Sequence, residues 1–271
     1  MSDVNPLQML QTPGAGGETP LEELQGSFDP TYLAGFFGTG LTQYIFWMIV
    51  CVILTLVVVL VGGKRLKLIP TDKFANMVDY GYDAIRRNMG ENAIGEGYEK
   101  HMPLIATMFF FILISNFVGL IPGFKTPTGT LSVTWALSTV AFFYFNWQGI
   151  KARGGWGYIK SIAPSGLPKV MVPVIWFFEL ISLMLRWLTL AVRLYGNMFA
   201  GHMVLGIFAL MTSVFIQGMI MSGNVLFGLP PIAWMLFLIA MYALECLVAF
   251  LQAYVFSILT SVYIGGAIST H

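Results

Sequence analysis

Charged residues are scarce in this chain, and the long stretches without them indicate its class. Only 10% of the 271 residues are charged and 57% are hydrophobic, whereas an ordinary soluble domain has about 25% charged residues. No Asp, Glu, Lys or Arg occurs from Leu194 to Leu244. This composition excludes an ordinary soluble domain and predicts an all-α, polytopic membrane protein, because about 20 consecutive apolar residues form one membrane-crossing helix.

Basic residues are missing from both ends of the chain. No Lys or Arg precedes Lys64 or follows Arg193, whereas seven lie from Lys64 to Lys100. A nucleic-acid-binding protein gathers its basic residues on one solvated face, so we expect no nucleic-acid partner. The first forty residues are polar and acidic, and no basic segment precedes an early apolar stretch. We therefore expect no ordinary cleavable signal peptide.

Cysteine and the common catalytic motifs are also nearly absent. Cys51 and Cys246 both lie in apolar runs, so we interpret them as small hydrophobic residues and not as a disulfide or metal ligands. The chain has no phosphate-binding glycine loop, metal-ligand cluster or nucleophile–base arrangement. We therefore expect no cofactor, no metal and no catalysis by the isolated chain.

Apolar runs predict about five membrane helices. The first three spans are expected near residues 41–61, 103–120 and 131–150, with an amphipathic segment at 66–101 that is partly helical around 74–88. The last two runs, 170–221 and 232–268, would be about 75 and about 55 Å long as straight helices, whereas the bilayer core is about 30 Å thick. Because Gly and Pro residues separate these runs, we predict a long, strongly tilted antiparallel hairpin.

The loop charges predict the orientation of the chain. Segments 64–100 and 151–169 carry seven and four basic residues, whereas the segment before the first span carries none. The positive-inside rule then places the N-terminus outside and, after five passes, the C-terminus inside. We divide the chain into a polar segment outside (1–40), three passes with an inside amphipathic segment (41–169) and the hairpin that carries the ion pathway (170–271).

The first long helix carries polar side chains along one face. They follow steps of three, four, three, four and four residues: Glu179, Ser182, Arg186, Thr189, Arg193 and Asn197. Such steps keep side chains on one side of an α-helix. An arginine cannot lose its proton, and holding one in mid-membrane costs about 2.5–3.5 kcal/mol on insertion scales. Arg193 therefore needs a partner, a water-filled cavity or a role.

The second long helix has its own polar residues, which are Tyr242, Glu245, Gln252 and Tyr263. In an antiparallel hairpin, one register brings Arg193 near Gln252 and His202 near Glu245. His202 lies nine residues after Arg193, which places it half a turn round the helix. Either the helix twists or kinks near a glycine, or His202 serves a different aqueous space from Arg193.

Each of these residues also has a purely structural explanation. Arg193 could extend to an interface or pair with Glu245, and Arg186 could reach lipid headgroups. Glu179 could be an interfacial acid, and His202 could be a hydrogen-bonded core residue. Ser182 and Thr189 can bond to their own helix, and Asn197 and Gln252 can join helices. The chemistry that the set supports is proton or cation movement, because burial easily shifts the pKa values of Glu and His.

Four motifs lie in or beside the predicted spans: LAVRLYGNMFAGH at 190–202, LQAYVFSILTSVY at 251–263, NFVGLIPG at 116–123 and TPT at 126–128. They resemble subunit a of F-type ATP synthases, the membrane stator beside the rotating c-ring. The resemblance extends from residue 41 to the C-terminus. It implies proton translocation in an energy-coupling membrane, such as the bacterial plasma membrane. The implied partners are c-ring proteolipids, b-type peripheral stalk subunits and membrane lipid.

The resemblance also implies residue roles. Arg193 corresponds to the stator arginine that faces the c-ring carboxylate and separates two half-channels. Asn197, His202, Glu245 and Gln252 correspond to the outer half-channel and the contact with the ring, and Glu179 and Ser182 correspond to the inner half-channel. The role of Arg186 stays open, as do those of Thr189, Tyr242 and Tyr263. The alternatives are a self-contained ion-coupled transporter or channel and a structural membrane scaffold.

Overall fold

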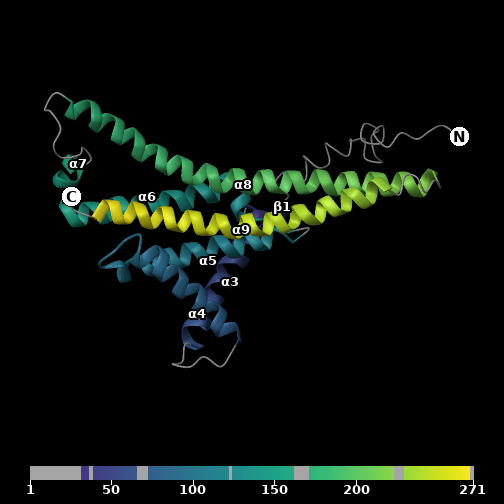
Figure 1. Ribbon diagram of the computed structural model, residues 1–271, viewed down its shortest axis with the longest axis horizontal. Coiled ribbons are helices and arrows are strands. Elements are labelled where there is room, and N and C mark those ends of the chain that lie inside the picture. The colour runs from purple at the N-terminus through teal and green to yellow at the C-terminus, as the bar shows by residue number, and fades with distance from the viewer. Residues whose placement is uncertain are drawn as a thin grey trace. The chain divides into compact units, whose positions relative to one another are not determined.

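The structure, a computed structural model, describes residues 32–36, 39–65, 73–121, 124–161, 171–222 and 229–268. These residues are almost entirely helical (Figure 1), so the predicted all-α class is confirmed. The helices are α3 (Gln43–Arg65), α4 (Lys73–Ile85), α5 (Met102–Gly119), α6 (Leu131–Arg153), α7 (Gly155–Ser161), α8 (Val172–Ser222) and α9 (Leu229–Ile268). Shorter elements are a π-helix η1 (Arg86–Glu91) and the 3-10 turns η2 (Tyr98–Lys100) and η3 (Pro127–Gly129). The strands β1 (Tyr32–Phe36) and β2 (Thr39–Thr42) pair antiparallel, which the sequence did not predict.

Four of the described helices are long and apolar enough to cross a membrane: α3, α5, α8 and α9. The third predicted span corresponds to α6, which has 23 residues but a more polar composition. Its polar side chains are bonded inside the fold, because Thr134 donates to the carbonyl of Leu131 and Ser138 donates to that of Trp187. Bonding of this kind makes polar residues compatible with a membrane helix.

Contacts divide the chain into two compact units. Unit 1 comprises Met1–Phe46 and Asn197–Val248, and unit 2 comprises Trp47–Gly196 and Ala249–His271. Residues 1–31 lie outside the described residues, so the predicted outside segment 1–40 is described only in part. The three-part division by sequence stays a prediction.

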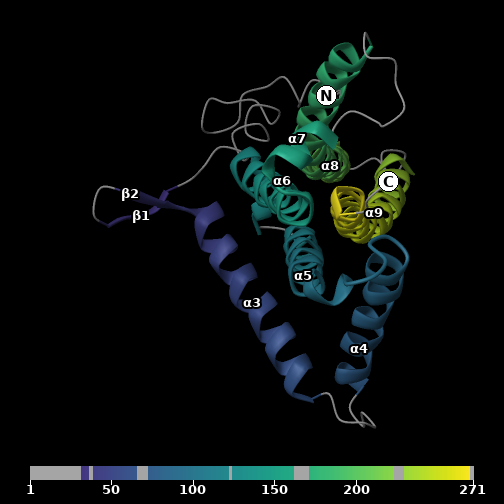
Figure 2. The same ribbon diagram turned by 90° about the vertical axis from the view of Figure 1, so that its left-hand side faces the viewer.

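The core of unit 2 is built on α5. Ile105, Phe109 and Ile112 are buried and follow the helical spacing of four and three residues, which places them on one face. They pack in one cluster with Phe145 of α6 and Phe256 of α9. Figure 2 shows α5 beside α6 and the C-terminal part of α9, with α3 and α4 extending away from them.

Aromatic side chains join α8 to α9 within unit 1. The ring of Phe208 lies 5.3 Å from that of Trp234 and 6.2 Å from that of Phe237, and Phe215 lies 6.3 Å from Trp234. Within unit 2, Arg186 of α8 lies over Tyr263 of α9. Arg186, near the start of α8, contacts Tyr263 near the end of α9, whereas Phe215, near the end of α8, contacts Trp234 near the start of α9. This order is the one that the predicted antiparallel pairing requires. The tilt of the two helices in the membrane stays a prediction.

Candidate functional site: an ion pathway

Arg193 lies on the exposed side of α8. Its neighbours Ala191 and Leu194 are fully buried, whereas the Arg193 side chain is exposed. It forms no hydrogen bond, ion pair or ring contact with any residue that the structure describes. The fold thus presents a permanent positive charge outward from an apolar helix, without the internal ion pair that a structural arginine would have.

Arg186, two turns earlier on α8, is held differently. Its guanidinium carbon lies 5.3 Å from the ring centroid of Tyr263, and the side chain is half-buried. A cation above an aromatic face at this distance is stabilised by the ring's negative face. This contact keeps Arg186 against α9, so the fold favours an internal position over the extension to lipid headgroups that the sequence left open.

A cavity of about 150 Å³ lies beside Arg186 in unit 2. Its lining comes from α6, α7, α8 and α9: Phe145, Arg153, Tyr158, Glu179, Leu183, Arg186, Tyr263, Gly266 and Ala267. The cavity has room for several water molecules, and its polar lining can bind them. It therefore brings together three residues singled out from the sequence, Glu179, Arg186 and Tyr263.

The sequence does not predict a functional role for two residues of this cavity, Arg153 and Tyr158. Arg153 is one of the four basic residues of segment 151–169, and Tyr158 follows a glycine-rich stretch without a helical pattern. The Tyr158 hydroxyl donates to Asn146 Oδ1 at 2.8 Å, and its ring lies where a β-carbon of Gly149 would stand. Burial raises the pKa of Tyr158, and the positive charges of Arg153 and Arg186 oppose that rise. Both arginines line the same cavity as Tyr158.

Glu245 is a buried carboxylate on α9 in unit 1. It is 4% exposed, and its Oε1 has no hydrogen-bond partner among the described residues. A β-carbon on Gly201 of α8 would fall on this carboxylate, so a larger residue there would require the Glu245 side chain to move. A buried carboxylate with an unfilled acceptor is costly unless it binds a proton or water.

The predicted register of His202 with Glu245 is therefore nearly right, since Gly201 precedes His202 directly on α8. His202 is half-buried and belongs to the same part of α8 in unit 1 as Gly201. α8 is continuous through Gly196 and Gly201.

The remaining predicted residues are divided between the two units. Gln252 is 6% exposed and belongs to unit 2, as Arg193 does. The direct pairing of Gln252 with Arg193 stays a prediction. Asn197 and Tyr242 are half-buried in unit 1, and Ser182 is half-buried in unit 2. Thr189 is exposed and donates to the carbonyl of Arg186 at 3.2 Å, which is the bond to its own helix that the sequence offered as an alternative.

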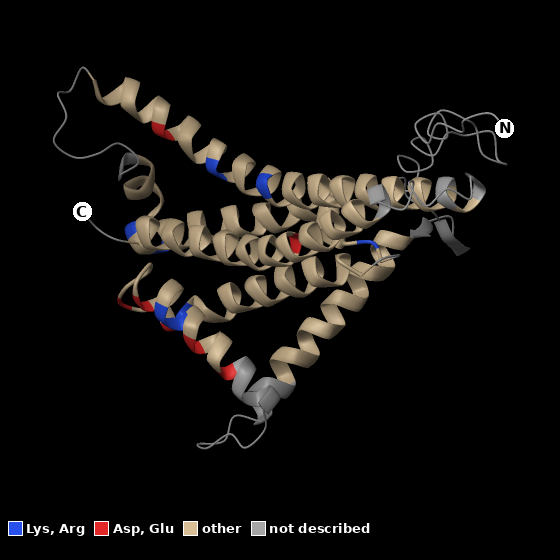
Figure 3. Cartoon of the chain, turned by 45° about the vertical axis from the view of Figure 1, so that its right-hand side comes forward, with Lys and Arg blue, Asp and Glu red and all other residues tan. Residues whose placement is uncertain are grey.

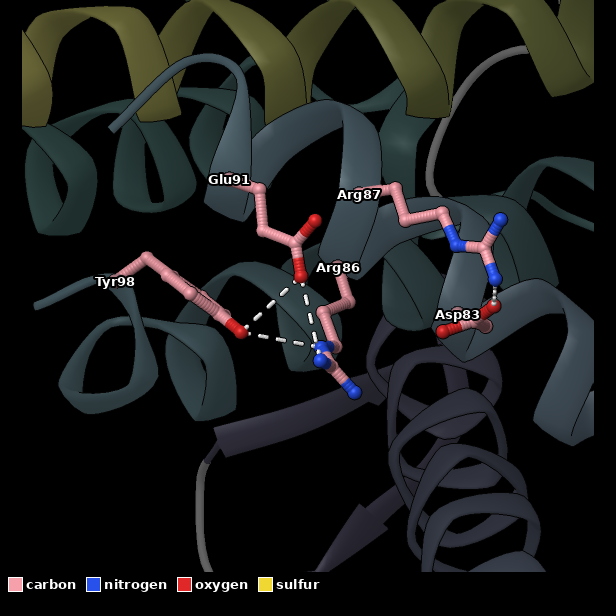
Figure 4. Close-up of polar contacts among 5 residues, drawn as sticks. All are labelled: Asp83, Arg86, Arg87, Glu91 and Tyr98. Atoms are coloured by element: carbon pink, nitrogen blue, oxygen red, sulfur yellow. Dashed lines mark hydrogen bonds and ion pairs between the residues drawn. The ribbon is translucent and has the colours of Figure 1, made fainter. Parts of the chain in front are cut away.

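Most of the other charged residues that the structure describes lie on α4 and the segment that follows it. Figure 3 shows them along α4 and the segment that follows it, whereas the long helices are nearly uncharged. Arg86 contacts Glu91 at 3.3 Å and the Tyr98 hydroxyl at 3.1 Å, and Arg87 contacts Asp83 at 2.8 Å (Figure 4). Because these pairs are exposed, each contributes little to stability.

Comparison with known proteins identifies the family. The family described as ATP synthase A chain matches residues 44–265. ATP synthase subunit a of Brucella ovis, of Brucella canis and of Brucella suis is in each case 38% identical over 207 residues, which cover 74% of this chain and 78% of the relative. An exposed arginine on an apolar helix, a buried carboxylate and a polar cavity thus occur in a chain that belongs to the ATP synthase A chain family.

Proposed function

We propose that this chain is the proton-translocating stator subunit of an F-type ATP synthase. It is a component of the complex and no enzyme by itself, since the catalytic sites lie in other subunits. The family assignment supports this role and gives no support to a stand-alone transporter. One observation carries the proposal: Arg193 is exposed on an apolar helix and has no partner among the described residues.

The exposed arginine suits a partner that arrives from another chain. A c-ring carboxylate that has lost its proton would be stabilised by the Arg193 charge, because opposite charges attract strongly where water is scarce. A protonated carboxyl has no such attraction and can face lipid at much lower cost. Arg193 therefore favours ionisation of each arriving ring carboxyl and blocks direct proton leakage between the two sides.

We assign the outer half-channel to unit 1. A proton arrives from outside by way of His202 and Glu245 and neutralises a ring carboxylate. The buried carboxylate of Glu245, with an Oε1 that has no described partner, supports this role. Within unit 1, Asn197 lines the approach to the ring and Tyr242 lies one helical turn before Glu245. Gln252, which belongs to unit 2, contacts the ring.

We assign the inner half-channel to the cavity of unit 2. After nearly a full turn of the ring, the carboxyl meets Arg193, ionises, and releases its proton inward past Ser182 and Glu179. The cavity supports this path because it holds Glu179 in a polar space with room for water. Arg186 and Tyr263 form one wall of this space, and Thr189 lies between Arg186 and Arg193 on α8.

The partners and orientation follow from the same role. We propose contacts with c-ring proteolipids, b-type peripheral stalk subunits and membrane lipid in a bacterial plasma membrane. The N-terminus lies outside and the C-terminus inside. The 51 and 40 residues of α8 and α9 fit the bilayer if both helices are strongly tilted along the ring.

The test is removal of the Arg193 charge in the assembled complex. Arg193→Leu should abolish ATP-driven proton pumping in inverted membrane vesicles while the complex stays assembled. Arg186→Leu is the matched control, because it removes the same kind of side chain from the same helix and should leave residual pumping. Normal pumping by Arg193→Leu would contradict the proposal, and proton transport by the purified chain alone would favour a stand-alone transporter.

A further inference from the structure

Buried polar side chains gather at the C-terminal end of α5, in a region outside the proposed half-channels. They are Ser115 and Asn116 of α5 and Thr126 and Thr128 at η3, and each is at most 3% exposed. Polar groups are costly to bury unless they are hydrogen-bonded. The cluster therefore needs a structural or functional reason, and its bonds indicate one.

The bonds lead from η3 across α5 to α9. The Thr126 hydroxyl contacts the carbonyl of Ser115 at 3.1 Å and the Thr128 hydroxyl at 2.7 Å. Thr128 in turn donates to Asn116 Oδ1 at 2.7 Å, which orients the amide. The amide nitrogen of Asn116 then donates to the carbonyl oxygen of Ala249 at 3.2 Å. A glycine at 119 leaves room for Thr126, since a β-carbon there would fall on the threonine side chain.

The bond to Ala249 has a particular geometric effect. Ala249 lies inside α9, where its carbonyl also serves the helix, and the second lone pair of a carbonyl oxygen can accept another bond. A side chain bonded to one carbonyl of a helix holds that helix at one depth and one rotation. Apolar packing alone tolerates small slips far better, because it has no preferred partner atom.

The held position lies close to the functional residues of α9. Within unit 2, Ala249 belongs to a buried stripe with Gln252, Ala253 and Phe256, each at most 6% exposed. The neighbouring Leu251 is 50% exposed. A rotation of α9 by one residue, about 100°, would exchange Gln252 for an apolar side chain on the buried side.

We propose that Asn116 is a positioning residue for proton translocation. Its hydrogen bond to Ala249, oriented by Thr128, fixes the depth and rotation of the unit-2 part of α9 and so holds Gln252 in place. Asn116 itself carries no proton. This role rests on the proposed stator function, because it concerns the placement of residues that serve that function.

The experiment compares isosteric changes in the complete complex. Asn116→Leu removes both bonds of the amide. Thr128→Val keeps the amide and its bond to Ala249 but removes the bond that orients it, together with the Thr126–Thr128 hydroxyl contact. Thr128→Ser keeps the hydroxyl. Thr134→Val is the matched control, because Thr134 is equally buried but bonds only to carbonyls at the start of its own helix. For each variant we would measure assembled complex in membranes and protons pumped per ATP hydrolysed.

We expect assembled Asn116→Leu complexes to pump at least fivefold fewer protons per ATP, Thr128→Val to be intermediate, and Thr128→Ser and Thr134→Val to be close to the unchanged chain. Unchanged coupling in assembled Asn116→Leu would overturn the positioning role and leave the stator function intact.

If Asn116→Leu does not assemble, the coupling measured for Thr128→Val decides between the two outcomes. Normal coupling in Thr128→Val, or loss of assembly in both variants, also overturns the role, since a residue needed only for assembly is a folding element.

Discussion

Gly201 of α8 lies directly against the carboxylate of Glu245 of α9, with no space for a β-carbon between them. The pair lies within unit 1, where α8 and α9 also meet through aromatic rings. The absence of a side chain at position 201 therefore leaves the space that the Glu245 carboxylate occupies.

Gly201→Ala should displace the Glu245 carboxylate and reduce ATP-driven pumping by about tenfold or more, because a small misplacement of a reacting group can lower rates a hundredfold. Pumping per assembled complex is the measurement. Gly196→Ala is the control, since a β-carbon at position 196 meets nothing within 4 Å. Equal pumping by both variants would show that the position of this carboxylate is unimportant.

Glu245→Gln tests whether this carboxyl carries protons. The amide keeps the shape and polarity of the side chain but cannot bind and release a proton at neutral pH, so we expect a strong loss of passive proton conductance through the membrane sector. Glu245→Asp keeps a titratable group and should retain more conductance. If the glutamine variant conducted as well as the aspartate variant, Glu245 would have a structural role only.

Tyr263→Leu should release Arg186 from α9. The contact at 5.3 Å depends on the aromatic face, and such pairs contribute about 0.5–2 kcal/mol. We expect lower pumping or a less stable complex for Tyr263→Leu and near-normal behaviour for Tyr263→Phe, which keeps the ring. Thermal unfolding of the purified complex and pumping assays measure the two effects. A defect in Tyr263→Phe as large as that in Tyr263→Leu would assign the role to the hydroxyl instead.

His101 should make stability depend on pH. His101 directly precedes α5, is 6% exposed, and has Nδ1 2.9 Å from the hydroxyl of Tyr144. Burial lowers the pKa of His101 below its usual value of 6.5, and the charge of Lys100 lowers it further. The unfolded chain therefore binds a proton more readily than the folded chain, so stability should fall as the pH drops below about 6.5.

The melting temperature of the purified complex at pH 7.5 and pH 5.5 measures this dependence. His101→Gln, which cannot be protonated in this range, should show a smaller decrease between the two pH values. The same decrease in both proteins would assign the pH dependence to other groups.

The helices could be predicted well from the sequence because each apolar run ends at a clear break. Predicted spans at 103–120 and 131–150 correspond to α5 and α6, and the runs at 170–221 and 232–268 correspond to α8 and α9. The antiparallel register was also predictable to within one residue at Glu245, since helical spacing fixes which residues share a face.

The cavity could not be predicted in full. Arg153 and Tyr158 reach it from α6 and α7. The short helix α7 begins at a pair of glycines, and no periodicity in the sequence predicts that it lies beside α8. Likewise, the contact of Asn116 with Ala249 joins residues 133 positions apart. Such contacts depend on how the chain packs as a whole, which local patterns do not encode.

The exposed position of Arg193 also affects how the subunit is made. In the proposed stator, this guanidinium would face lipid or draw water into the membrane before a c-ring is present, at a cost of about 2.5–3.5 kcal/mol on insertion scales. Assembly with the ring would remove much of that cost by supplying a carboxylate. The isolated chain would then be less stable than the assembled one, and its folding would be thermodynamically linked to its incorporation into the complex.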